Sequence, residues 1–259
     1  MKRALAKGTW VVTGAASGFG REFAERLAAR GEPLALWDRD VEGARETQRR
    51  IGRTHSAVFE VDVTDPASVA RASEQTRAEL GAVAHAIHCA GVLRVGPAGS
   101  LPAADYALMM NVNYLGSVHV AQALLPQLEQ AQGGRATLML TASVAGLRGF
   151  PELAGYSASK FAVVGFGQAL RDELAGSRVD VKVLCPPPGD TPMVQKLPKR
   201  PPIYKLSKLY SAAEIVGAAL RQIEGKRWLI LVDPGSKVLH AVDSLLPGVV
   251  DRIVRLTAR

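Results

Sequence analysis

Short apolar runs alternate with amphipathic segments along most of this chain. The runs predict strands at 9–13, 34–37, 57–61, 83–88, 136–140, 179–184 and 228–232. Between them, apolar residues at helical spacing predict helices, including 66–80, 155–174, 212–223 and a long region, 101–132, that is interrupted near 111–116. This alternation predicts an α/β fold with a doubly wound, parallel, seven-stranded sheet flanked by helices. No repeat or linker divides the chain, so residues 1–259 are expected to form a single domain.

Two stretches depart from this alternation. Residues 190–210 are rich in proline and lysine and predict an irregular lid. Within it, the segment 196–210 interleaves five basic residues with six large apolar ones: Leu197, Ile203, Tyr204, Leu206, Leu209 and Tyr210. The tail, 236–259, is amphipathic, and Pro247 and Gly248 should break it into two short helices. Together they suggest peripheral contact with an anionic membrane. The alternative is a lid over a small soluble substrate and a tail that packs on the core.

A glycine-rich turn follows the first strand. Gly14, Gly18 and Gly20 lie between that strand and an amphipathic helix, with Ser17 and Phe19 among them. A strand, a glycine turn and a helix N-terminus make a cradle for phosphate groups, because glycine lets the backbone approach and the helix supplies N–H donors. The spacing differs from the common Gly-x-Gly-x-x-Gly, and a plain glycine turn is the alternative.

Asp38 ends the second strand, 24 positions after Gly14. A carboxylate near this distance accepts the adenosine ribose hydroxyls and repels a 2′-phosphate, so it favours NAD over NADP. Arg39 is the complication, since an arginine there accommodates that phosphate. The alternative role for Asp38 is a helix cap, because the next helix opens at Asp40 and Val41.

Tyr156 and Lys160 stand four residues apart and so share one face of a helix. An ammonium group beside a phenol favours the phenolate, which makes the pair a plausible proton shuttle. Ser143, 13 residues before Tyr156, could hold a substrate oxygen beside it. Taken alone, the pair could equally be a helix surface contact.

Composition excludes several classes of protein. The net charge of +8 fits a solvated basic surface, an anionic cofactor or a lipid surface, but the chain carries no zinc-finger spacing, basic zipper or RNA-binding motif, so no nucleic-acid partner is predicted. The five histidines show no zinc pattern, since His85 and His88 should face opposite sides of a strand, and no metal is predicted. No serine-hydrolase elbow is present. Two cysteines and no apolar run of about 18 residues fit a reducing cytoplasm.

The combined motifs resemble the short-chain dehydrogenase/reductase family over about residues 8–235. They are the glycine turn after Thr13, Asp62-Val63, Ala90-Gly91, Asn113-x-x-Gly116, Ser143 and Tyr156-x-x-x-Lys160. The resemblance implies a single-domain Rossmann fold and a catalytic tetrad of Asn113, Ser143, Tyr156 and Lys160. Tyr156 would be the acid/base and Ser143 would orient the carbonyl. Lys160 would bind the nicotinamide ribose and lower the tyrosine pKa, and Asn113 would hold a water.

The resemblance also implies contacts for the ligands. The cofactor would touch Gly14, Ser17, Gly18, Phe19, Gly20, Asp38, Arg39, Asp62, Val63, Cys89, Ala90, Gly91, Tyr156, Lys160, Pro186, Gly189 and Thr191. An alcohol or ketone substrate would touch Ser143, Ala145, Phe150, Tyr156, Pro187 and Met193. The family usually assembles as homodimers or homotetramers through the helices near 103–131 and 155–175.

Two departures from the family pattern narrow the prediction. His88-Cys89 replaces Asn-Asn, and Pro186-Pro187 replaces Pro-Gly. Both look like 3-ketodihydrosphingosine reductases, which use NADPH on a lipid ketone, but Asp38 does not fit their phosphate-binding pattern. The prediction is therefore an NAD-linked dehydrogenase of a hydrophobic or lipid-like secondary alcohol, with NADP the less favoured coenzyme. The alternatives are the NADPH-dependent ketosphinganine-type reductase and a non-catalytic redox sensor.

Overall fold

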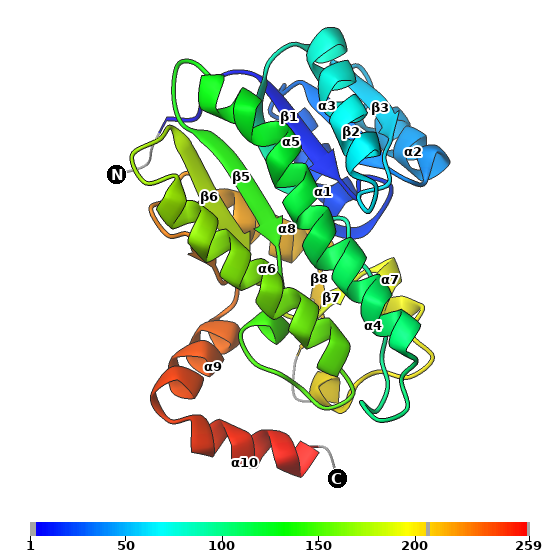
Figure 1. Ribbon diagram of the computed structural model, residues 1–259, viewed down its shortest axis with the longest axis vertical. Coiled ribbons are helices and arrows are strands. Elements are labelled where there is room, and N and C mark those ends of the chain that lie inside the picture. Colours follow the sequence, from blue (N-terminus) through cyan, green and yellow to red (C-terminus); the bar gives the residue numbers. More distant parts are fainter. Residues whose placement is uncertain (1–3, 206–207, 258–259) are drawn as a thin grey trace.

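The seven predicted apolar runs form one parallel sheet in the computed structural model, which describes residues 4–205 and 208–257 (Figure 1). The spatial order is β3-β2-β1-β4-β5-β6-β9, and every pairing is parallel. The predicted α/β, doubly wound architecture is confirmed. Its strands are β1 (Thr9–Thr13), β2 (Leu34–Asp38), β3 (Ser56–Glu60), β4 (Val83–His88), β5 (Ala136–Thr141), β6 (Val179–Leu184) and β9 (Leu229–Ile230).

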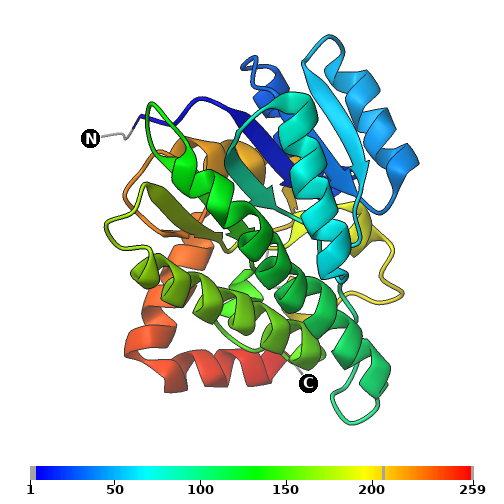
Figure 2. The same cartoon turned by 45° about the horizontal axis from the view of Figure 1, so that its top comes forward.

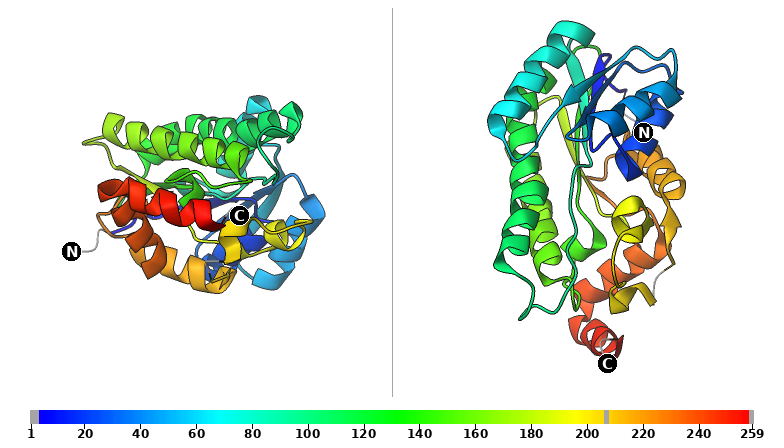
Figure 3. Two further views of the ribbon diagram at one scale, coloured as in Figure 1. Left: turned by 90° about the horizontal axis from the view of Figure 1, so that it is seen from below. Right: turned by 90° about the vertical axis from the view of Figure 1, so that its right-hand side faces the viewer.

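Two layers of helices cover the sheet (Figure 3). Phe23 and Leu27 pack on one face, and Val69, Leu124 and Val163 pack on the other, so the strands are buried on both sides, as their continuous apolar runs require. The first layer contains α1 (Gly18–Ala28), α2 (Val41–Ile51) and α8 (Ala212–Gln222). The second contains α3 (Pro66–Leu80), α5 (Gly116–Gln130) and α6 (Ala154–Glu173).

The interruption predicted near 111–116 is a π-helical stretch, Met110–Leu115, between α4 (Ala103–Met109) and α5. Such stretches often mark functional positions, and this one carries Asn113. The α3 helix begins as its sequence indicates, with the Asp65 side chain accepting from the Ala67 amide and Pro66 in the first turn. The last strand is shorter than the predicted 228–232, and the third lies one residue earlier than predicted.

The predicted lid and tail lie at the carboxyl ends of the strands (Figures 1 and 2). The lid contains α7 (Pro192–Gln195), a 3₁₀ turn at Pro202–Lys205, and a two-stranded sheet of β7 (Gly189–Asp190) and β8 (Tyr210–Ser211); Leu206 and Ser207 lie outside the described residues. The tail forms α9 (Pro234–Leu245) and α10 (Pro247–Thr257), so the break at Pro247 is confirmed. In the described part of the chain, no helix is long and apolar enough to cross a bilayer. That the chain is one domain stays a prediction.

His85 and His88 are buried in β4. The His85 ring stacks on Trp10 with centroids 4.0 Å apart, and its Nε2 lies 2.9 Å from the Ala6 carbonyl oxygen. His88 Nδ1 lies 2.8 Å from the Thr13 hydroxyl. Burial lowers the pKa of His85 to about 4, and burial together with the charge of Lys160 lowers the pKa of His88 to about 3. Both rings are therefore neutral at physiological pH.

These histidines make the fold sensitive to acid. Below pH 6.5 these two histidines bind protons in the unfolded chain but stay neutral in the folded chain. The free energy of unfolding therefore falls as the pH falls towards 4. We expect each histidine to remove about 2 kcal/mol between pH 6.5 and pH 5. Urea unfolding measures this loss. The His88→Asn variant should lose about half as much on acidification, whereas the exposed His55→Asn control should behave like the native protein. Equal stability of the native protein at pH 7 and pH 5 would contradict this assignment.

Candidate active site

A cavity of about 860 Å³ opens at the carboxyl ends of the strands, where the chain order reverses between β1 and β4. Asn113 is the only predicted site residue that does not line it. The predicted cofactor residues on its wall are Gly14, Ser17, Gly18, Phe19, Gly20, Asp38, Arg39, Asp62, Val63, Cys89, Ala90, Gly91, Tyr156, Lys160, Pro186, Gly189 and Thr191. The predicted substrate residues there are Ser143, Ala145, Phe150, Tyr156, Pro187 and Met193. Their roles stay predictions, but the fold brings them to one space.

In the glycine turn after β1, Gly14 and Gly20 have no room for a side chain. Gly14 has a φ of 68°, and a Cβ there would lie 2.9 Å from the Ala90 amide nitrogen. A Cβ on Gly20 would lie 2.1 Å from the Gly14 carbonyl oxygen. The turn therefore keeps bare backbone beside the N-terminus of α1, which fits a pyrophosphate.

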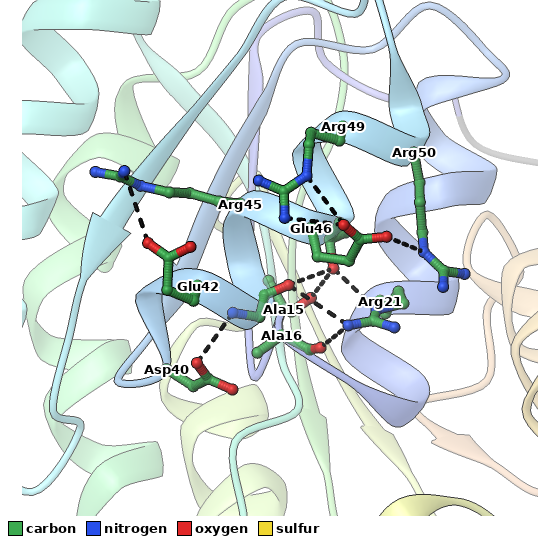
Figure 4. A network of polar contacts seen from close by, with 11 residues as sticks. Ala15, Ala16, Arg21, Asp40, Glu42, Arg45, Glu46, Arg49 and Arg50 are labelled. Atoms are coloured by element: carbon green, nitrogen blue, oxygen red, sulfur yellow. Dashed lines mark hydrogen bonds and ion pairs between the residues drawn. The ribbon is translucent and has the colours of Figure 1, made fainter.

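Two polar side chains that the sequence did not single out, Arg21 and Thr47, bind the backbone of this turn. Figure 4 shows Arg21 beside Ala15 and Ala16. Arg21 of α1 donates to the Ala16 carbonyl oxygen and, at 3.0 Å, to the Thr47 hydroxyl. Thr47 of α2 is fully buried and donates to the Ala15 carbonyl oxygen at 2.7 Å. The contacts tie both helices to the turn and fix its carbonyl groups away from the cavity.

Asp38 is placed as a coenzyme contact would require. Its two carboxylate oxygens accept from the Ala16 amide at 2.8 Å and the Asp40 amide at 2.9 Å. The N-cap of α2 is Asp40, whose side chain accepts from the Gly43 amide, so capping does not occupy Asp38. Its carboxylate lines the cavity beside Arg39.

Asp62 and Thr13 shape the neighbouring walls. Asp62 accepts from the Thr64 amide and hydroxyl, and these bonds lower its pKa. The Thr13 hydroxyl accepts from the amides of Cys89 and Ala90, both at 3.1 Å, and also contacts His88. His88, which stands where the family has asparagine, thus takes part in joining β1 to the loop after β4.

Tyr156, Ser143 and Lys160 converge at the other end of the cavity. Tyr156 and Lys160 come from the first turns of α6, and Ser143 follows β5. Ser143 and Tyr156 both line the cavity, and Ser143 acts as a hydrogen-bond donor that lowers the Tyr156 pKa. The Lys160 Nζ lies 5.7 Å from the Tyr156 ring centroid and donates to the Thr141 carbonyl oxygen at 2.8 Å. The alternative of a helix surface pair is wrong, because Lys160 is only 4% exposed.

The predicted lowering of the Tyr156 pKa is also wrong for the chain by itself. Burial raises this pKa, with a further increase from Tyr204, and these effects exceed the lowering by the Ser143 hydrogen bond. The physical reason is that a buried phenolate loses its hydration. Burial also lowers the pKa of Lys160 to about 8. In the chain by itself the tyrosine is therefore a phenol.

Asn113 supports this site from outside the cavity. Its Oδ1 accepts from the Val92 amide at 2.8 Å, and its Nδ2 donates to the Val92 carbonyl oxygen and the Ser159 hydroxyl. A Cβ on Gly91 would lie 3.1 Å from Asn113 Oδ1 and 3.6 Å from Lys160 Nζ, so the amide and the amine approach the same point. The side chain joins the loop after β4 to α6, and its part in holding a water stays a prediction.

Comparison with known proteins settles the family. The sequence model of the family described as short chain dehydrogenase matches residues 9–202 of this chain. The chain belongs to the short chain dehydrogenase family. It is accordingly an NAD(P)-dependent oxidoreductase that acts on CH–OH groups. Membership of the ketodihydrosphingosine reductase subgroup does not follow from the match.

The relatives have varied substrates. The 2-dehydro-3-deoxy-L-rhamnonate dehydrogenase (NAD(+)) of Sphingomonas sp. (strain SKA58) is 36% identical over 200 residues, covering 77% of this chain and 79% of the relative. The 1-deoxy-11-beta-hydroxypentalenate dehydrogenase of Streptomyces avermitilis is 38% identical over 200 residues, covering 74% and 73%. A short chain dehydrogenase/reductase from Burkholderia phymatum, solved in complex with NAD, superposes with a TM-score of 0.82 at 28% identity, covering 93% and 95%.

Proposed function

We propose that this enzyme transfers a hydride between NAD and a secondary alcohol or ketone carried by a hydrophobic molecule. The observation that carries the proposal is the apolar wall beside Tyr156. Leu93, Phe150, Leu153, Val250 and Val254 are buried together there, with Tyr156 packed against them. Removing an alkyl chain from water against such a wall contributes about 0.8 kcal/mol per CH₂ group.

The side chains around Tyr156 supply the proton chemistry. In ketone reduction, the Tyr156 phenol donates its proton to the carbonyl oxygen, and the Ser143 hydroxyl donates a hydrogen bond to the same atom. When bound, the nicotinamide supplies the hydride in this direction and accepts it in the reverse one. In alcohol oxidation Tyr156 must receive the proton as a phenolate. Because burial opposes that charge in the chain by itself, the ammonium of Lys160, 5.7 Å from the ring centroid, would have to offset the burial.

Asp38 underlies the proposed preference for NAD. Replacing it should raise the ratio of NADP to NAD activity about tenfold, or about 1.4 kcal/mol, because a like-charge contact with the 2′-phosphate disappears. The kcat/KM ratio for the two coenzymes measures this in Asp38→Ser. Asp38→Asn is the matched variant, since it removes the charge but keeps an oxygen acceptor for the Ala16 or Asp40 amide. A native enzyme that prefers NADP would show that Arg39 dominates.

A second candidate is the NADPH-dependent ketosphinganine-type reductase. Arg39, which lines the cavity beside Asp38, is the feature that favours it. The coenzyme ratio distinguishes the two candidates. Turnover of any alcohol or ketone separates both from a non-catalytic redox sensor. A cytoplasmic location and a homodimer or homotetramer remain predictions.

The substrate class is tested with a series of secondary alcohols of increasing alkyl length and their ketones, with a sugar alcohol as the polar comparison. We expect kcat/KM to rise with each added CH₂ group, because the wall beside Tyr156 is apolar. Best activity on the sugar alcohol would contradict the proposed substrate class while leaving the hydride transfer intact.

A further inference from the structure

The two C-terminal helices, α9 and α10, expose an unusual amount of apolar surface. Six of the nine large apolar side chains that are exposed in the described part of the chain lie on these two helices or at the residue that joins them. They are between 50% and 79% exposed: Val238, Leu245, Leu246, Val249, Ile253 and Leu256. Single exposed apolar residues are ordinary, but a contiguous group marks an interaction site.

These side chains form stripes beside the buried face of each helix. Val249, Ile253 and Leu256 follow the i, i+4, i+7 spacing of one helical face, while Val250 and Val254 are buried on the neighbouring face. Val238 and Ile253 also line the cavity, so the exposed stripes are continuous with its mouth. The pair projects from the end of the molecule, clear of both helical layers (Figure 1).

The helix pair is basic around these stripes. Lys237, Arg252 and Arg255 are exposed. Its two acidic residues, Asp243 and Asp251, are both bound by Arg148, whose single positive charge offsets one of the two carboxylates and which anchors the helices beside the cavity. The lid turn at Pro202–Lys205 packs against α10 and follows the exposed Lys199 and Arg200. Lys199 is paired with Glu152, but Lys237, Arg252, Arg255 and Arg148 still outnumber the two aspartates, so the border of the apolar strip is net positive.

This combination matches the surface of an anionic bilayer. Amphipathic helices with basic flanks lie in the membrane interface, and each Lys or Arg near an anionic leaflet adds to the attraction. Neither helix, at 12 and 11 residues, could span the hydrocarbon core, which takes about 20. A twofold contact with a second copy would bring two patches of the same net positive charge together, which like-charge repulsion disfavours.

We propose that the outer face of the α9–α10 pair docks on an anionic phospholipid membrane and admits a membrane-dissolved substrate through the mouth at Val238 and Ile253. The proposal rests on the proposed function, because it explains how a hydrophobic alcohol or ketone reaches Tyr156. It adds a surface and a partner to that function. Binding to the membrane requires no chemistry, so it can be tested separately from turnover.

Sedimentation of the full chain with NAD and lipid vesicles tests the docking. We expect binding to phosphatidylcholine vesicles that contain phosphatidylserine, little binding to phosphatidylcholine alone, and release by salt, because screening weakens the attraction. Reversing Arg252→Glu with Arg255→Glu should weaken binding at least tenfold. So should the triple change Leu245→Ser, Leu246→Ser and Val249→Ser, which alters exposed residues outside the cavity wall.

The matched control is Arg30→Glu with Arg53→Glu. These exposed residues lie in turns at the opposite, amino edge of the sheet and give the same change in net charge. The control should bind vesicles like the native protein, and all variants should oxidise a short, soluble secondary alcohol at the native rate.

Three results would overturn the docking proposal. They are no vesicle binding at low salt, an equal loss in the control, and a native dimer that becomes monomeric in the triple variant, which would assign the stripes to a second copy. If the soluble alcohol is still turned over in these cases, the proposed function stands. Vesicle binding without turnover of any alcohol or ketone would instead overturn the proposed function.

Discussion

We expect the Tyr156→Phe variant to turn over about 10²–10⁴-fold more slowly than the native enzyme, because a positioned acid–base group usually contributes a factor of this size. The change removes one oxygen atom and keeps the ring that packs against the buried apolar cluster. Ser143 cannot take its place as a proton donor, because a serine hydroxyl is a far weaker acid than a phenol. The loss should therefore fall on kcat, while NAD binding stays close to native.

Tyr204→Phe is the matched control for this experiment. Tyr204 also lines the cavity and raises the pKa of Tyr156, so its hydroxyl is close enough to influence the site. Its removal should cost far less turnover, since no proton is transferred by it. Steady-state rates and coenzyme titrations distinguish the two variants. A Tyr156→Phe enzyme with near-native turnover, or a Tyr204→Phe enzyme equally impaired, would contradict the assigned roles.

The Gly20→Ala variant should lose both stability and coenzyme binding. The added Cβ would lie 2.1 Å from the Gly14 carbonyl oxygen and 3.0 Å from the Ala15 amide nitrogen, and both are backbone atoms that cannot rotate away. The turn must open, and overpacking of this kind costs about 1–3 kcal/mol. Because the same turn forms the proposed pyrophosphate cradle, NAD affinity should fall at least tenfold, which 1.4 kcal/mol of misplacement suffices to produce.

Gly165→Ala provides the comparison for Gly20→Ala. Gly165 is exposed in the middle of α6, and a Cβ there meets no atom within 4 Å. Alanine should stabilise that helix by about 0.5–1 kcal/mol. Denaturant unfolding with and without NAD measures both variants. Equal stability and equal NAD affinity of Gly20→Ala and the native chain would show that the turn tolerates a side chain.

The sequence predicted what depends on local spacing. Continuous apolar runs locate the strands, and the glycines after β1 and the Tyr156–Lys160 pair locate both ends of the cavity. The shift in the Tyr156 pKa was mispredicted because it arises mainly from burial, and then from the electrostatic effect of Tyr204, which is distant in the sequence. The hydrogen bond between Arg21 and Thr47 was missed because it joins two helices. A threonine on the buried side of α2 was the signal that a polar contact lies there. Asp233 was missed as well: its side chain caps the start of α9 by accepting a hydrogen bond from the Ser236 amide.

Transfer of deuterium tests the central claim most directly. The enzyme is incubated with NAD and a long-chain secondary alcohol deuterated at its carbinol carbon, and the mass of the reduced coenzyme is measured. If the hydride passes between the alcohol and the coenzyme beside Tyr156, the reduced coenzyme formed by the native enzyme carries the deuterium. Tyr156→Phe should form it at least about 100-fold more slowly. Deuterium that stays in the alcohol, with either NAD or NADP bound to the native enzyme, would contradict the account.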